Sequence, residues 1–206
     1  MSRGPATLLV ATGSSNKLVE LRRLFGAAGL DLVDLREAGV VGEAPEDGAT
    51  FEANALQKAR WYADATGLWT LADDSGLEVR ALGGAPGVRT RRYAGPNATD
   101  VENYERLLRA LEGVPDGERG ARFVCVMALV DPLDAVERTY RGEREGTIVR
   151  APRGTQGFGY DPVFEVDGRT MAERSAPEKD ALSHRGAAAA QVAAALPALL
   201  AARLAR

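Results

Sequence analysis

Short apolar runs alternate with helically spaced apolar positions along the first third of the chain. Short apolar runs are typical of buried strands, and apolar side chains three and four positions apart are typical of helices. The predicted elements are strands at 7–11, 30–35 and 68–72 and helices at 17–28 and 51–66. Gly29 ends the first helix, and Thr50 is a good N-cap for the second. The order of these elements is that of strand–helix–strand units.

Hairpin signals dominate the remainder of the chain. Strands are predicted at 77–81, 122–130, 135–142, 145–150, 161–166 and 169–172, and helices at 100–112, 177–182 and 183–203. Thr99 and Glu102 have the spacing of a capping box, and Asp167-Gly168 is a strong two-residue hairpin turn. The combination predicts an α/β fold, with a mixed sheet and helices on its faces, in a single domain over residues 1–206.

Composition narrows the class of protein. The 206 residues carry a net charge of −3, which gives no electrostatic reason to bind a nucleic acid or an acidic membrane. The alanine-rich run at 187–202 is shorter than the roughly 20 residues that span a bilayer, so we expect a closing helix packed on the body. Cys125 is the single cysteine, which excludes an internal disulfide and favours the cytoplasm. His184 is the single histidine, so a bound metal must have oxygen ligands, as Mg²⁺, Mn²⁺ and Ca²⁺ do.

Lysine is scarce in this sequence. The 26 basic residues comprise 23 arginines and only Lys17, Lys58 and Lys179. Since arginine fills almost every other basic position, each lysine indicates a place where a compact ammonium is needed, for example to hold a phosphate. The alternative is three chance lysines on the surface.

Two polar segments follow predicted strands. The first lies between a strand and a helix, where backbone N–H groups favour an anion, and it consists of Thr12, Gly13, Ser14, Ser15, Asn16 and Lys17. An ordinary capped turn is equally compatible with this segment. The second, Asp73-Asp74-Ser75-Gly76, is expected at a strand end, and Glu43, Glu46 or Asp47 of the preceding acidic loop could supply a further metal ligand. A solvated turn is the alternative there.

Two later segments suit a nucleotide base. Phe158 and Tyr160 place aromatic rings beside Gly159 and Asp161, and a base could stack on such rings. A hydrophobic anchor in a hairpin loop is the alternative for them. The triplet Ser183-His184-Arg185 offers three donors at the start of a helix, and His184 is expected as a donor or a capping residue rather than a general base.

Together these segments resemble the inosine triphosphate pyrophosphatase family. The matching stretches are Ala11-Thr-Gly13 with Lys17 and Glu20, Gly48–Ala59, Ala72–Leu77, Leu82–Gly87, Gly157–Pro162 and Ser183–Gly186. The resemblance implies an elongated two-lobed subunit with the substrate in a cleft between the lobes, a homodimer, and a Mg²⁺-dependent hydrolysis of ITP, dITP or XTP to the monophosphate and pyrophosphate. Ser14 stands where the family usually has asparagine, which changes how that position reaches a phosphate.

The resemblance also implies roles for individual residues. Glu46 and Asp74 hold Mg²⁺, Asp74 acts as the base for the attacking water, and Asp73 supports its loop. Lys58 and the other lysines carry the charge of the departing pyrophosphate. Ser75 belongs to the same substrate-binding segment. We further expect His184 and Arg185 to read the base.

Two other functions fit the same residues. A nucleotide-binding module without turnover would use the same phosphate turn and aromatic loop. A pyrimidine pyrophosphatase acting on dTTP or UTP would have a similar architecture. The acidic pair beside a candidate Mg²⁺ site favours an enzyme.

Overall fold

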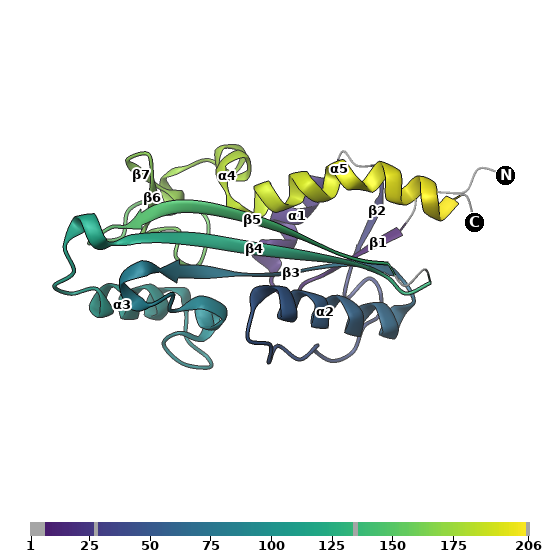
Figure 1. Ribbon diagram of the computed structural model, residues 1–206, viewed down its shortest axis with the longest axis horizontal. Coiled ribbons are helices and arrows are strands. Elements are labelled where there is room, and N and C mark those ends of the chain that lie inside the picture. Colours follow the sequence, from purple (N-terminus) through teal and green to yellow (C-terminus); the bar gives the residue numbers. More distant parts are fainter. Residues whose placement is uncertain (1–6, 27–28, 134–135, 205–206) are drawn as a thin grey trace. The chain divides into compact units, whose positions relative to one another are not determined.

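The computed structural model describes residues 7–26, 29–133 and 136–204 (Figure 1). The strands are β1 (Thr7–Ala11), β2 (Asp31–Asp34), β3 (Trp69–Val79), β4 (Gly120–Asp131), β5 (Val136–Ile148), β6 (Phe164–Val166) and β7 (Arg169–Thr170). The α-helices are α1 (Ser15–Phe25), α2 (Phe51–Thr66), α3 (Asp100–Ala110), α4 (Ala176–Leu182) and α5 (His184–Leu204). Short 3₁₀ helices are η1 (Arg80–Leu82), η2 (Gly87–Arg92), η3 (Asp116–Glu118) and η4 (Met171–Glu173).

The strands form one seven-stranded sheet in the order β2-β1-β3-β4-β5-β6-β7. Strand β1 pairs in parallel with both β2 and β3, whereas β5 with β6 and β6 with β7 pair antiparallel. The parallel part follows from helical crossovers and the antiparallel part from hairpins. The predicted mixed α/β sheet is therefore confirmed.

The chain divides into two compact units, and the prediction of a single domain stays a prediction. The first unit takes residues 1–74, 126–142 and 187–206, and the second takes 75–125 and 143–186. Strands β3, β4 and β5 and helix α5 each contribute residues to both units. The boundary within β3 falls between Asp74 and Ser75, which are neighbours in the chain.

The first unit packs β1 and one face of α5 into its core. Leu8, Leu9 and Val10 are completely buried, as a strand within a parallel sheet requires. On α5, Ala188 and Val192 are completely buried four residues apart, so that one face of the helix packs inward. By length and composition alone, α5 is also the one helix in the described ranges that is apolar enough to cross a membrane. Its buried face is equally typical of a core helix.

The second unit has its own hydrophobic core. It is formed by Leu77, Val79, Leu107, Leu111, Ala121, Phe123, Ile148, Tyr160, Val163, Phe164, Val166 and Met171. The rings of Phe123 and Phe164 meet edge to face with centroids 4.5 Å apart. Helix α3 contributes Leu107 to this core and begins with the predicted capping box at Thr99 and Glu102, which is confirmed.

The largest difference from the sequence prediction lies in β3. The segment Asp73-Asp74-Ser75-Gly76 was expected to leave the sheet, but β3 continues through it without interruption to Val79. The prediction that Asp73 supports a loop is therefore wrong. Aspartate, serine and glycine are common in turns, yet here lysines from other elements compensate the buried carboxylates, and this long-range pairing outweighs the local turn signal.

Smaller differences concern element ends. Helix α1 begins at Ser15 rather than 17, because the Ser14 hydroxyl accepts the N–H of Lys17 and caps the helix. The expected strand at 145–150 is no separate element, since its first four residues continue β5 to Ile148. Residues 80–82 form η1 instead of ending a strand, and the strand expected from 161 begins at Phe164. The ends predicted at residues 28 and 135 lie outside the described residues.

Candidate active site

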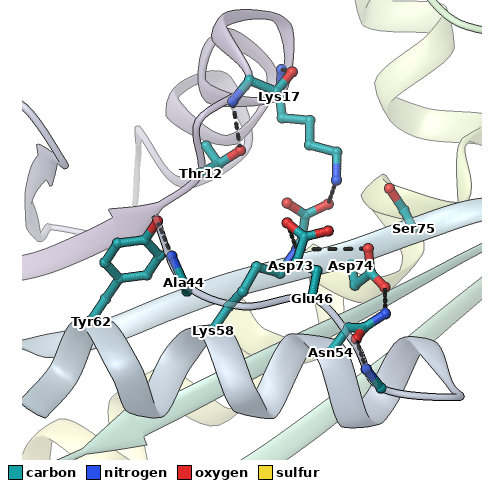
Figure 2. A network of polar contacts seen from close by, with 12 residues as sticks. Thr12, Lys17, Ala44, Glu46, Asn54, Lys58, Tyr62, Asp73, Asp74 and Ser75 are labelled. Carbon is teal, nitrogen blue, oxygen red and sulfur yellow. Dashed lines mark hydrogen bonds and ion pairs between the residues drawn. The ribbon is translucent and has the colours of Figure 1, made fainter. Parts of the chain in front are cut away.

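Two adjacent aspartates of β3 form ion pairs with lysines from two different helices. Lys17 Nζ, on α1, lies 2.9 Å from Asp73 Oδ2, and Lys58 Nζ, on α2, lies 3.6 Å from Asp74 Oδ1. Successive side chains of a strand point to opposite faces, so one aspartate meets each helix. Figure 2 shows this arrangement, with Lys17 and Lys58 approaching β3 from opposite sides.

The acidic loop, residues 43–48, runs along α2 through a series of side-chain contacts. Tyr62 Oη accepts the N–H of Ala44 at 3.3 Å, and Lys58 Nζ lies 3.3 Å from Glu46 Oε1. Gln57 Nε2 donates to Asp47 at 2.8 Å, and the Gly48 N–H donates to Asn54 Oδ1 at 2.7 Å. Loop residues increase in number as helix residues decrease. The loop is therefore held antiparallel to the helix, with Glu46 beside Lys58.

The electrostatics of this group follow from burial and opposite charge. Burial would lower the pKa of the Lys58 ammonium, but Asp74, Asp73 and Glu46 together outweigh burial and raise this pKa. Burial raises the pKa of the Asp74 carboxyl, although Lys58, Lys17 and the Asn54 amide act against it. In these ion pairs, Lys17 meets Asp73, and Lys58 lies between Glu46 and Asp74.

Glu46 and Asp74 are the Mg²⁺ ligands that the family resemblance implies, and that role stays a prediction. Their carboxylates lie 3.3 and 3.6 Å from the same cation, the Lys58 ammonium. The Glu46 side chain is 39% exposed, which leaves it accessible to a metal ion. No cluster of three or more histidine, cysteine, aspartate or glutamate residues suited to a metal occurs in the part of the chain that the structure describes. Two carboxylates suffice for Mg²⁺, which usually keeps water and substrate phosphates in its shell.

The predicted phosphate turn lies at the N-terminus of α1. Thr12 Oγ1 accepts the N–H of Ser14 at 3.2 Å, and Ser14 Oγ accepts the N–H of Lys17 at 3.4 Å. Ser15 and Asn16 are exposed in the first helical turn, and a Cβ added to Gly13 would meet no atom within 4 Å. The first turn of a helix presents N–H groups that suit an anion.

The second unit gathers another set of predicted residues around Phe158. Lys179 Nζ lies 4.4 Å from the centre of the Phe158 ring and forms an ion pair with the buried Asp161. Asp161 Oδ2 also accepts the N–H of Phe158 at 2.8 Å. Gly157 adopts a φ of 77°, and a Cβ there would come within 2.1 Å of Asp161 Oδ2. The Asp161 carboxylate therefore fixes the conformation of the aromatic loop, residues 157–161, and the Lys179 ammonium packs on the Phe158 ring.

One residue of this set is used differently from the sequence prediction. Tyr160 was expected as a stacking surface, but it is 2% exposed within the core and its hydroxyl donates to the carbonyl of Thr90 at 2.9 Å. Burial raises its pKa above the ordinary value. Lys179 was expected at the phosphates; it forms an ion pair with Asp161, and its role at the phosphates stays a prediction. Gly159 donates its N–H to Asp100 at 2.7 Å, which fixes the loop to the start of α3.

The triplet Ser183-His184-Arg185 is almost completely buried. The His184 ring stacks on Phe123 with centroids 4.6 Å apart, and Ser183 Oγ accepts the N–H of Gly186 at 3.0 Å. Arg185 is 2% exposed, donates from Nη2 to Ser75 Oγ at 2.9 Å, and holds its guanidinium 5.7 Å from the Phe158 ring centre. The structure thus brings Ser75, Phe158 and Arg185 together.

Sequence reasoning assigned no role to Asn54. Its amide is 1% exposed and donates from Nδ2 to Asp74 Oδ2 at 3.0 Å, while its Oδ1 accepts from Gly48 (Figure 2). The available signal was its position four residues before Lys58, which puts both side chains on one face of a helix.

A mixed α/β sheet that carries lysine–carboxylate pairs beside a capped helix start is a scaffold for phosphate chemistry. The comparison with known families makes this class specific. The model described as "Ham1 family" matches residues 8–195, and the chain belongs to this family. The sequence motifs predicted a resemblance to pyrophosphatases of deaminated purine nucleotides, and this resemblance is confirmed.

Individual relatives cover nearly the whole chain. The dITP/XTP pyrophosphatase of Mycobacterium tuberculosis is 52% identical over 197 residues, which are 93% of this chain and 94% of that protein. The dITP/XTP pyrophosphatase of Syntrophobacter fumaroxidans is 50% identical over 185 residues, which are 89% of this chain and 78% of that protein. Among solved structures, a HAM1 protein from Coxiella burnetii matches with a TM-score of 0.85 and 44% identity, covering 93% of this chain and 98% of that chain.

Proposed function

We propose that this protein hydrolyses deaminated purine nucleoside triphosphates (ITP, dITP and XTP) to the monophosphate and pyrophosphate. The observation that carries the proposal is the acidic pair of β3, in which Asp74 lies beside Lys58 and Glu46 while Asp73 binds Lys17. Relatives about 50% identical over most of the chain are dITP/XTP pyrophosphatases, which supports the same reaction here.

The chemistry assigns separate tasks to these residues. Glu46 and Asp74 would hold Mg²⁺. The metal would offset the negative charge of the triphosphate and the further charge that develops on the leaving group during the reaction. The Asp74 carboxylate accepts the proton of the attacking water. The water oxygen bonds to the α-phosphorus, the bond from that phosphorus to the bridging oxygen breaks, and pyrophosphate leaves.

Cationic and N–H groups support the same step. Lys58 and Lys17 offset the charge of the leaving pyrophosphate, and the segment from Thr12 to Lys17 donates to phosphate oxygens. Positioning and charge stabilisation account for most of the catalysis of such reactions. Residues of the second unit, above all Phe158 and Arg185, are assigned to the base of the same nucleotide. The two-lobed subunit with its cleft stays an expectation of the family resemblance.

Pyrophosphate release tests the proposal directly. We expect one pyrophosphate per molecule of ITP, dITP or XTP with Mg²⁺, little from ATP, and none after the metal is removed with EDTA. Binding of ITP without pyrophosphate release would instead identify a nucleotide-binding module. Preference for dTTP or UTP would identify a pyrimidine pyrophosphatase.

The assembly and location are also proposals. The family resemblance implies a homodimer, and the single cysteine favours the cytoplasm. The net charge of −3 argues against nucleic acid or an acidic membrane as a partner. Light scattering of the purified protein, with and without Mg²⁺, tests the dimer. Cell fractionation tests the location.

A further inference from the structure

Asn54 joins the acidic loop to the acidic strand through a single buried amide. Its Oδ1 accepts the Gly48 N–H at 2.7 Å, and its Nδ2 donates to Asp74 Oδ2 at 3.0 Å. The side chain is 1% exposed, so water does not compete for either contact. One side chain therefore contacts both segments that supply the proposed Mg²⁺ ligands.

The Gly48 contact fixes which way the amide points. A backbone N–H can only donate, so it must meet the oxygen of the Asn54 amide. The amide nitrogen then faces Asp74, which can accept but not donate while it is ionised. The two hydrogen bonds select one orientation of the amide, and that orientation occupies Oδ2 of Asp74 and leaves Oδ1 toward Lys58.

Close packing at Gly48 maintains this geometry. A Cβ at Gly48 would lie 2.7 Å from Asn54 Oδ1 and 2.9 Å from the Cβ of Ala53. Any larger residue would push the loop away from the amide. Lys58 also bridges Glu46 and Asp74, but an ammonium with three rotatable donors does not determine the rotation of a carboxylate.

We propose that Asn54 is a positioning residue that orients the Asp74 carboxylate and registers the acidic loop against it. The proposal rests on the proposed function in one respect, namely that Asp74 acts on the attacking water. Asn54 makes no contact with the substrate in this scheme. Its loss should therefore lower kcat and leave KM almost unchanged.

Two variants at Asn54 separate its two contacts. Asn54→Asp keeps an oxygen for the Gly48 N–H but replaces the donor to Asp74 with a second acceptor. Asn54→Ala removes both contacts. Gln57→Ala is the matched control, because Gln57 contacts Asp47 of the same loop from the same helix. We expect kcat to fall about 10- to 100-fold in both Asn54 variants, the range typical of residues that orient ligands, and to stay near the parental value in Gln57→Ala.

Two readouts do not depend on activity. Hydrogen exchange of the Gly48 amide, measured without metal or nucleotide, should accelerate in Asn54→Ala and stay slow in Asn54→Asp. Crystal structures should show a rotated Asp74 carboxylate in both variants. Gly48→Ala adds a variant that leaves Asn54 itself intact, and we expect the same loss of kcat.

The outcomes distinguish the two proposals. If the parental protein releases no pyrophosphate from any of ITP, dITP and XTP, the proposed function fails, while amide exchange and the Asp74 orientation still decide the role of Asn54. Parental kcat in Asn54→Asp, an unmoved Asp74 carboxylate, or an equal loss in Gln57→Ala would each overturn the positioning role.

Discussion

The three lysines of this chain all form ion pairs with buried or nearly buried carboxylates. Lys17 pairs with Asp73, Lys58 with Asp74, and Lys179 with Asp161, whose side chains are 1%, 10% and 4% exposed. Arginine fills the exposed basic positions, including Arg60 and Arg80, which pair with exposed glutamates. The scarcity of lysine in this arginine-rich sequence thus indicated three positions at which a cation pairs with a buried or nearly buried carboxylate. In each of these three pairs a compact ammonium meets the carboxylate, where a planar guanidinium would need more room.

Lys58→Arg should therefore lower kcat although the charge is kept. Lys58 is 8% exposed between two carboxylates, and the wider fork of arginine would displace at least one of them. Loss of one charge-stabilising donor costs about 10²–10³ in kcat, so we expect at least about tenfold here. Steady-state kinetics with ITP measure this, and a parental melting temperature checks the fold. Parental kinetics would assign Lys58 to the structure alone.

Asp74→Asn tests the proposed base. The substitution keeps the shape and an oxygen for the Asn54 amide but removes proton acceptance, and about 10²-fold or more of kcat should be lost. Saturating Mg²⁺ separates this loss from weaker metal binding. Asp64→Asn, an exposed carboxylate on α2, serves as the control. Activity within a few-fold of the parent would contradict the role of Asp74.

At the scale of elements, the sequence predicts helix caps correctly, but it does not predict which distant residues pair with one another. Thr50 and Thr99 cap α2 and α3 as predicted, because a cap depends on residues within one turn. The continuation of β3 through Asp73 and Asp74 depends on lysines more than ten residues away in the chain, and no local pattern contains that information. For the same reason the sequence predicts candidate site residues but not the partner with which each one pairs.

The capping box of α4 predicts a measurable pH dependence. Glu178 accepts from the Ser175 hydroxyl, the Ser175 N–H and Arg169, which lower its pKa from 4.5 to about 2. A carboxyl with a lowered folded-state pKa stabilises the fold fully above its unfolded value, and this contribution is lost as pH falls from about 4.5 toward 2. Glu178→Gln should therefore reduce the melting temperature most at pH 5 and above.

The comparison of parent and variant across pH isolates this residue. The difference in melting temperature between the parental protein and Glu178→Gln should shrink at pH 3, whereas other carboxylates affect both proteins alike. Ser175→Ala, which removes the hydroxyl donor, should show the same trend with a smaller amplitude. A difference that stays constant from pH 7 to 3 would contradict the linkage.

For the whole molecule, the proposed chemistry divides between the two units. The carboxylates and lysines assigned to phosphate and metal, from Lys17 to Asp74, belong to the first unit. Phe158, Arg185 and Ser75, assigned to the base, belong to the second. Substitutions of the residues assigned to phosphate and metal should change the rate for every triphosphate, and substitutions of the residues assigned to the base should change selectivity.

The ratio of kcat/KM for ITP to that for ATP measures this division. Hypoxanthine carries an acceptor at position 6 where adenine carries a donor, and a buried donor left unpaired against adenine costs about 1–3 kcal/mol. We expect Arg185→Ala and His184→Ala to shrink this ratio about tenfold or more. Asp74→Asn should lower kcat/KM for both ITP and ATP and leave their ratio unchanged. Because Arg185 and His184 are buried, Arg185→Lys provides a variant that keeps the charge and most of the volume. If all variants reduce kcat/KM for ITP and for ATP equally, Arg185 and His184 do not recognise the base. Base recognition must then come from other residues of the chain.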